Sequence, residues 1–136
     1  MQRENIMEKL KFDSGIKCYR LGSGVLRCNP TDPNLYARFL EALQEVTALE
    51  ETLTEQSRAV SGEGVIRLLT EADTKIKDIL NRVFGLDNDF SKILEGVNLM
   101  AVGSNGERLI TNLFAALEPV LTEGAMQCAK AEAAKL

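Results

Sequence analysis

The 136-residue chain contains no histidine and no tryptophan, and only 5% of its residues are aromatic. Histidine is the usual general base near neutral pH and the commonest zinc ligand. Its absence removes Ser-His and Cys-His nucleophiles together with the most frequent metal centres. The scarcity of aromatic residues predicts a core of Leu, Ile, Val and Ala, which is typical of helices packed on helices.

Cysteine is also scarce. Cys18, Cys28 and Cys128 form no CxxC pair, and their odd number indicates free thiols in a reducing compartment. Residues 1–9 are too polar for a secretory signal, and no apolar run approaches the ~20 residues that a membrane helix needs. We therefore expect a cytoplasmic protein without a membrane partner.

The charge balance is acidic, with 16 Lys and Arg against 20 Asp and Glu. The basic residues are scattered rather than clustered, so nucleic acid is not an expected partner. Gly22-Ser23-Gly24 lacks the Lys-Ser/Thr pair of a phosphate-binding loop, and the carboxylates lack the spacing of a calcium loop. We therefore expect no cofactor, no metal and no enzyme activity.

The only strand-like region precedes the helices. Residues 16–21 and 25–28 flank the glycine-containing turn and predict a β-hairpin. With Ser23 at the centre of the turn, Cys18 lies opposite Cys28, where paired side chains are about 4.5–5.5 Å apart at Cβ. Two small apolar strand residues are the simpler interpretation, and a redox switch is the alternative.

Two long helices follow. Asp32 suits an N-cap and Pro33 the first helical position. Apolar residues recur at steps of three and four over 35–53 and again over 65–83, separated by the break at 61–64. This pattern predicts an antiparallel pair of helices.

The remaining sequence predicts a short helix and a third long one. Gly85 ends the second helix, and Asp87 or Asp89 caps a short helix that closes at Gly96. The apolar stretch 97–102 is a buried connector or one further turn of helix. Ser104 and Glu107 have the spacing of a capping box, which predicts a last helix running through 109–121 with a kink at Pro119.

The predicted fold is mainly α (α+β): an N-terminal β-hairpin followed by a helical bundle of three long helices and one short helix. We expect a flexible arm at 1–9, a single domain at 10–124 and a projecting helical tail at 125–136, since the tail is rich in Ala and Lys.

Some apolar residues lie beside the main helical stripes. A stripe this wide indicates a helix contacted on more than one side, by the rest of the domain or by another copy of the chain. The candidate protein-binding residues are Leu40, Leu43, Leu68, Leu80 and Phe114.

The order of segments resembles the small tail assembly chaperones of long-tailed phages and prophages of Gram-positive bacteria. The resemblance covers roughly residues 10–122, and its most specific part is Val83 to Met100. The segments that carry it are Phe12-Asp13, VLRCNPTD at 25–32, LYARF at 35–39, ILNRVFG at 79–85, ILEGVNL at 93–99 and LFAAL at 113–117.

This resemblance implies a non-enzymatic protein that acts in the infected cell, coats the tape measure protein and recruits tail tube subunits. Amphipathic helices on a small acidic protein would suit shielding of a long apolar helix. Self-association is also compatible with the wide stripes. Two alternatives are a phage-encoded inhibitor of a host protein and an enzyme that uses only carboxylates, with Asp87, Asp89 and Glu107 as its candidates.

Overall fold

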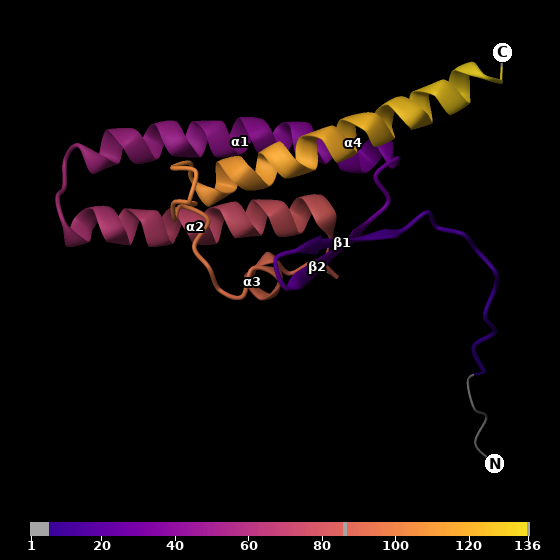
Figure 1. Ribbon diagram of the computed structural model, residues 1–136, viewed down its shortest axis with the longest axis horizontal. Coiled ribbons are helices and arrows are strands. Elements are labelled where there is room, and N and C mark those ends of the chain that lie inside the picture. The colour runs from indigo at the N-terminus through magenta and orange to yellow at the C-terminus, as the bar shows by residue number, and fades with distance from the viewer. Residues whose placement is uncertain (1–5, 86, 136) are drawn as a thin grey trace.

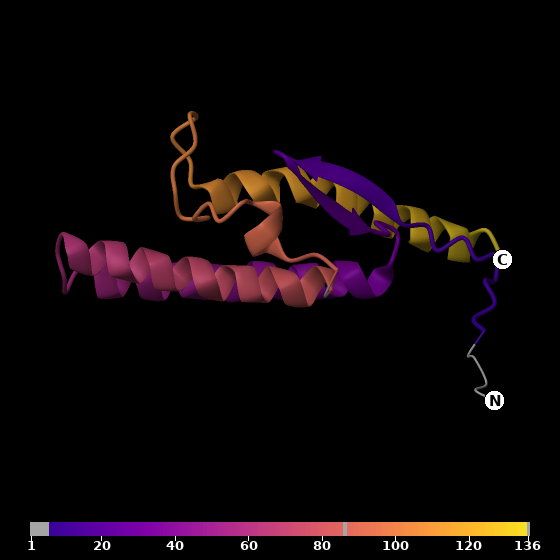
Figure 2. The same ribbon diagram turned by 90° about the horizontal axis from the view of Figure 1, so that it is seen from below.

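The computed structural model describes residues 6–85 and 87–135, which are arranged in two layers (Figures 1 and 2). One layer is the antiparallel pair α1 (Pro33–Ser57) and α2 (Glu63–Phe84). The other contains β1 (Lys17–Leu21), β2 (Gly24–Cys28), α3 (Phe90–Ile93) and α4 (Leu109–Ala133). The predicted mainly α fold, with its hairpin, three long helices and one short helix, is confirmed.

The start of α1 follows from its capping residues. Asp32 accepts a hydrogen bond from the backbone N–H of Asn34 at 2.9 Å, and Pro33 occupies the first turn. The predicted stripe of α1 faces α2 and α4, and Leu49 is its only member that stays partly exposed. Burial of each large apolar side chain contributes ~1.5–3 kcal/mol, so these contacts stabilise the paired helices.

Helix α4 packs across α1 from the second layer. Phe114 of α4 meets Phe39 of α1 edge to face, with ring centroids 5.7 Å apart and an interplanar angle of 84°. Further along α4, Gly124 is buried against the carbonyl group of Pro30. Beyond Gly124 the helix continues to Ala133 with mostly exposed side chains and extends past the end of α2 (Figure 1). Residue 136, part of the expected tail, lies outside the described residues.

The hairpin has a different register from the predicted one. Its turn consists of Gly22 and Ser23 alone, so Cys18 pairs with Arg27 and Lys17 pairs with Cys28. The predicted pairing of Cys18 with Cys28 is therefore wrong. Because side chains alternate along a strand, a shift of one residue places the two thiols on opposite faces.

The fit of β2 against α3 explains this register. A Cβ at Gly24 would overlap the backbone of Ile93, so the strand can approach α3 this closely only at a glycine. Gly24 therefore belongs to β2 and not to the turn. Gly22 provides the turn with its positive φ of 61°.

The predicted capping box before α4 is also wrong. The backbone N–H of Gly103 donates to the carbonyl of Glu107 at 2.8 Å, which closes residues 103–107 into a loop. Ser104 and Glu107 therefore lie in this loop, and α4 begins at Leu109 with Arg108 in the N-cap position. Asp89, by contrast, caps α3 as predicted by accepting from the N–H of Ser91 at 3.0 Å.

The segment before β1 carries neither helix nor strand over residues 6–16, and all of these residues are exposed. It leaves the hairpin at the end opposite the turn and extends away from both layers (Figures 1 and 2). The expected arm at 1–9 overlaps this segment at 6–9, and its first five residues lie outside the described part of the chain.

Candidate protein-binding groove

An open apolar pocket of about 390 Å³ lies in the second layer, and we call it the groove. It is bounded by the hairpin turn, the end of α3, the connector 94–99 and the first half of α4. Its apolar lining consists of Leu21, Ile93, Leu94, Val97, Leu99, Leu109, Leu113 and Ala116.

The floor of the groove is the core itself. Leu99 and Leu113 are buried there, whereas Leu94 and Leu109 are only partly covered. Val97 is 46% exposed at the edge. An incoming apolar side chain would therefore contact core residues directly, and the surface it covers would leave water on binding.

The polar groups of the groove are few and lie at its margin. The hydroxyl of Ser23 donates to the carboxylate of Glu95, which joins the hairpin turn to the end of α3. Asn112 of α4 also lines the groove and pairs with the side chain of Asn105. An apolar floor with a small number of polar groups is typical of binding sites in proteins.

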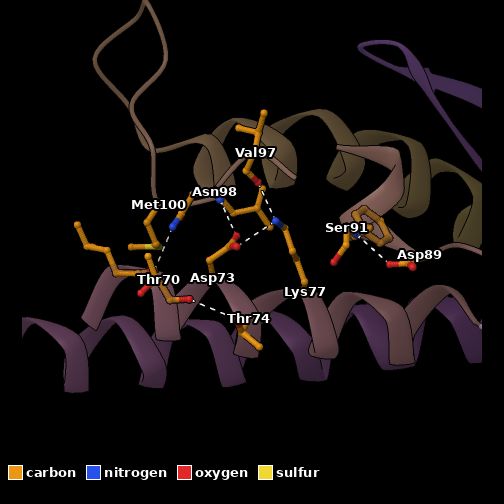
Figure 3. A network of polar contacts seen from close by, with 12 residues as sticks. Thr70, Asp73, Thr74, Lys77, Asp89, Ser91, Val97, Asn98 and Met100 are labelled. Carbon is orange, nitrogen blue, oxygen red and sulfur yellow. Dashed lines mark hydrogen bonds and ion pairs between the residues drawn. The ribbon is translucent and has the colours of Figure 1, made fainter. Parts of the chain in front are cut away.

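A buried ion pair fixes one wall of the groove (Figure 3). Lys77 of α2 donates to Asp73 at 2.9 Å and to the carbonyl of Val97 at 2.8 Å. The other oxygen of Asp73 accepts from the backbone N–H of Leu99 at 2.7 Å. The pair therefore ties the irregular connector to a regular helix and sets the positions of Val97 and Leu99 in the groove.

The opposite wall depends on Asn88, whose side chain is buried between α2 and β2. Its amide oxygen accepts from the N–H of Arg27 at 2.9 Å, and its amide nitrogen donates to the carbonyls of Arg27 at 2.8 Å and Phe84 at 3.0 Å. The side chain thus pairs with the outer edge of β2 as a neighbouring strand would. This contact holds the hairpin, and with it Leu21, against α3.

Burial favours the neutral form of two titratable groups of the hairpin. Burial raises the pKa of the Cys28 thiol. Burial also raises the pKa of Tyr19, with smaller contributions from the charges of Cys28 and Glu123. Both groups therefore favour their uncharged forms, and a raised pKa disfavours the thiolate that a cysteine nucleophile requires.

Among residues 6–85 and 87–135, no group of three or more Cys, Asp or Glu side chains is placed to hold a metal ion. Within the same residues, no helix combines the length and apolarity needed to cross a bilayer. Of the acids considered for catalysis, Asp89 caps α3 and Glu107 lies in the exposed loop before α4.

The predicted protein-binding residues do not form this groove. Leu80 is fully buried and belongs to the core, so it is not available on the surface. Leu43, Leu68 and Phe114 are partly buried against the core, and Leu40 is 43% exposed on α1. None of the five lines the groove.

Sequence reasoning missed the groove because its residues share no periodicity. Three separate stretches contribute to it, 21–23, 93–99 and 109–116, and the connector 94–99 has neither helical nor strand-like spacing. The available signal is the apolar stretch 97–102, which predicts a buried connector or one further turn of helix. Leu99 fulfils that interpretation, whereas Val97 faces the opening.

Comparisons with protein-family models, curated proteins and solved structures found no match. The function of the groove is therefore inferred from its own residues and from the resemblance noted in the sequence.

Proposed function

We propose that this protein is a non-enzymatic, tail assembly chaperone-like protein of a phage or prophage, acting in the host cytoplasm. Its groove would bind an apolar helix of the tape measure protein or a segment of the tail tube protein. The observation that carries this proposal is the open groove of about 390 Å³, with leucine side chains at its floor and edge.

The chemistry of the groove suits an amphipathic helix. Such a helix docks through apolar side chains at positions i, i+3 or i+4, and i+7. A pocket of this volume accommodates one or two of these side chains rather than a whole helix, so the rest of the helix would lie over the edge. Each buried Leu or Phe would contribute ~1.5–3 kcal/mol before the cost of association is subtracted.

The family resemblance supports the same location. The segment ILEGVNL at 93–99 belongs to the most specific part of that resemblance, and it provides Ile93, Leu94, Val97 and Leu99 to the groove. A groove built from these residues would be shared by proteins that keep the segment. The resemblance and the geometry therefore support one binding site.

The test is binding to helical fragments of the tape measure protein and to the tail tube protein from the same phage. Ala116 lies in the groove and is exposed, so Ala116→Glu should leave the fold intact. Ala115 is exposed on the same helix but outside the groove, and Ala115→Glu is the matched control. We expect the Ala116 variant to lose binding about tenfold or more and the Ala115 variant to retain it.

Co-expression gives a second measurement. The native chain should increase the soluble fraction of an aggregation-prone tape measure fragment, and Ala116→Glu should not. Failure to bind either tail protein would count against the proposal. One-to-one binding to a host enzyme in place of the tail proteins would favour the alternative of a phage-encoded inhibitor.

A further inference from the structure

We propose that the segment 6–13 of one copy, here called the arm, occupies the groove of a second copy, so that the protein self-associates by exchanging arms. The inference concerns the same groove but requires no tail protein as partner.

The arm presents apolar side chains that nothing in the described chain covers. Ile6, Met7, Leu10 and Phe12 are 82–95% exposed. Leu10 and Phe12 are two residues apart, so in an extended arm they point to the same side with a spacing of about 6.6–6.8 Å. Apolar groups gathered in this way are typical of a segment that binds elsewhere.

The base of the arm is held in place by Asn29. Its side chain donates to the carbonyl of Ser14 at 3.0 Å, and Asp13 accepts from the N–H of Gly15 at 2.9 Å. Gly15 has a φ of +70°, and a Cβ there would lie 2.6 Å from the amide nitrogen of Asn29. The chain can therefore pass Asn29 closely because residue 15 is a glycine.

This anchor keeps Phe12 away from the hairpin end of the groove of its own copy. Asn29 follows the end of β2 that lies away from the turn, and the five residue steps from Gly24 to Asn29 span about 16 Å of extended chain. Phe12 is two residues from Ser14 and can move only about 7 Å from it. Leu21, which pairs with Gly24, and Ser23 line the hairpin end of the groove, so this end lies farther from the anchor than Phe12 can move. The arm of a second copy has no such restriction.

The arm has no net charge, because Glu8 and Asp13 balance its two lysines, but it offers one ion pair to the groove. Among the described residues that line the groove, Glu95 is the only charged one. In the arm, Lys9 and Lys11 flank Leu10. When Leu10 and Phe12 insert, either lysine can extend to the edge and place its ammonium group near Glu95. Two copies that exchange arms reciprocally form a closed dimer.

The first test is the solution mass of the full chain, measured by sedimentation equilibrium over a hundredfold range of concentration. We expect a concentration-dependent dimer. Phe12→Asp and Leu10→Asp alter exposed side chains and should raise the dissociation constant of the dimer about tenfold or more. Ile66→Asp, at an exposed apolar position on α2, is the matched control and should dimerise normally.

The second test pairs the two sides of the contact. Ala116→Glu should weaken the dimer as the arm variants do, because the added carboxylate enters the groove. Mixing it with Phe12→Asp should give mixed dimers, since one variant keeps its arm and the other keeps its groove. Circular dichroism of each variant checks that the helices remain folded.

A native chain that stays monomeric at every concentration would overturn the inference, as would a Phe12→Asp variant with the native mass. Mixed variants that fail to pair would refute the arm-to-groove contact specifically. These measurements contain no tail protein, so a chain that dimerises but binds no tape measure fragment would refute the proposed function alone. If both proposals hold, Phe12→Asp should bind that fragment at least as tightly as the native chain, because its groove is unoccupied.

Discussion

Asp73 on α2 accepts a hydrogen bond from the backbone N–H of Leu99 at 2.7 Å, across 26 residues of sequence. The same carboxylate pairs with Lys77, which binds the carbonyl of Val97. Both side chains are largely buried, with 14% of Asp73 and 7% of Lys77 exposed. A buried ion pair is thus used to shape the wall of an apolar groove.

We expect Asp73→Ala to lower the free energy of unfolding by about 3–5 kcal/mol, because it leaves Lys77 buried without its partner. Urea denaturation measures this. Glu45→Ala, which breaks the exposed pair of Glu45 with Arg82, is the control and should cost about 1 kcal/mol or less. Adding Lys77→Met to Asp73→Ala should recover part of the loss. Equal costs for the two alanine variants would contradict the structural role of the buried pair.

The contact of Gly124 with Pro30 reverses the usual effect of a glycine in a helix. A Gly→Ala change inside a helix normally stabilises it by about 0.5–1 kcal/mol. Here the new methyl group would overlap the Pro30 carbonyl, so Gly124→Ala should instead destabilise the protein by about 1–3 kcal/mol. Thermal unfolding would show the sign. The control Ala129→Gly lies at an exposed site on the same helix and should lower stability, because glycine is ordinarily less favourable than alanine in a helix.

Loss of the Asn88 side chain should release the outer edge of β2. Asn88→Ala removes three hydrogen bonds and leaves the N–H and carbonyl of Arg27 without these partners. We expect a loss of about 1–3 kcal/mol or more and faster hydrogen exchange at the Arg27 amide. Asn105→Ala, in the exposed loop before α4, is the comparison and should leave that amide protected. Unchanged exchange at Arg27 would show that the side chain does not hold the strand.

The hairpin register predicts distinct reactivity for the cysteines. Cys18 is exposed, whereas Cys28 is buried and burial raises its pKa. Because the thiolate is the reactive form, alkylation should modify Cys18 in the native protein and Cys28 only after unfolding. The raised pKa keeps the Cys28 thiol protonated as the pH rises, so Cys28 should resist alkylation in the folded protein. Peptide mass spectrometry after mild oxidation should find no Cys18–Cys28 disulfide, and finding one would contradict the register.

Raised pKa values also predict an alkaline loss of stability. The thiol of Cys28 holds its proton more tightly in the folded state than in the unfolded state. The stability that the protonated thiol adds to the folded state is therefore fully present below the unfolded pKa of about 8.5. It is lost as the pH rises through the pKa of the thiol in the folded state. Stability measured from pH 7 to 10 should fall, and Cys28→Ala should reduce the slope of that fall even though it lowers stability overall. An identical slope in the variant would exclude Cys28 as the source.

Much of the fold follows from local signals in the sequence. The starts of α1 and α3 are set by capping residues, Asp32 with Pro33 and Asp89 with Ser91. Each cap acts on a residue one or two positions away, so no distant contact is needed to predict these starts. The apolar residues of α1 and α2 recur every three or four residues because that spacing matches one turn of a helix. The capping residues and the spacing of the apolar residues together predicted the helices and strands of the fold and the antiparallel pairing of the first two long helices.

The groove, the hairpin register and the start of α4 were not predicted correctly from the sequence. The sequence contained both Gly22 and Gly24 and could not show that Gly24 is needed against Ile93, which fixes the register. The spacing of Ser104 and Glu107 favoured a cap, but backbone pairing between Gly103 and Glu107 formed a loop instead.

The sequence by itself thus determined which segments are helices and strands, because caps, turns and apolar periods act over a few residues. The tertiary structure alone decided the hairpin register, the start of α4 and the existence of the groove. The register and the groove depend on segments far apart in the chain, such as Gly24 against Ile93, and no local pattern encodes such contacts. The start of α4 depends on backbone pairing within the loop 103–107, which side-chain spacing does not reveal.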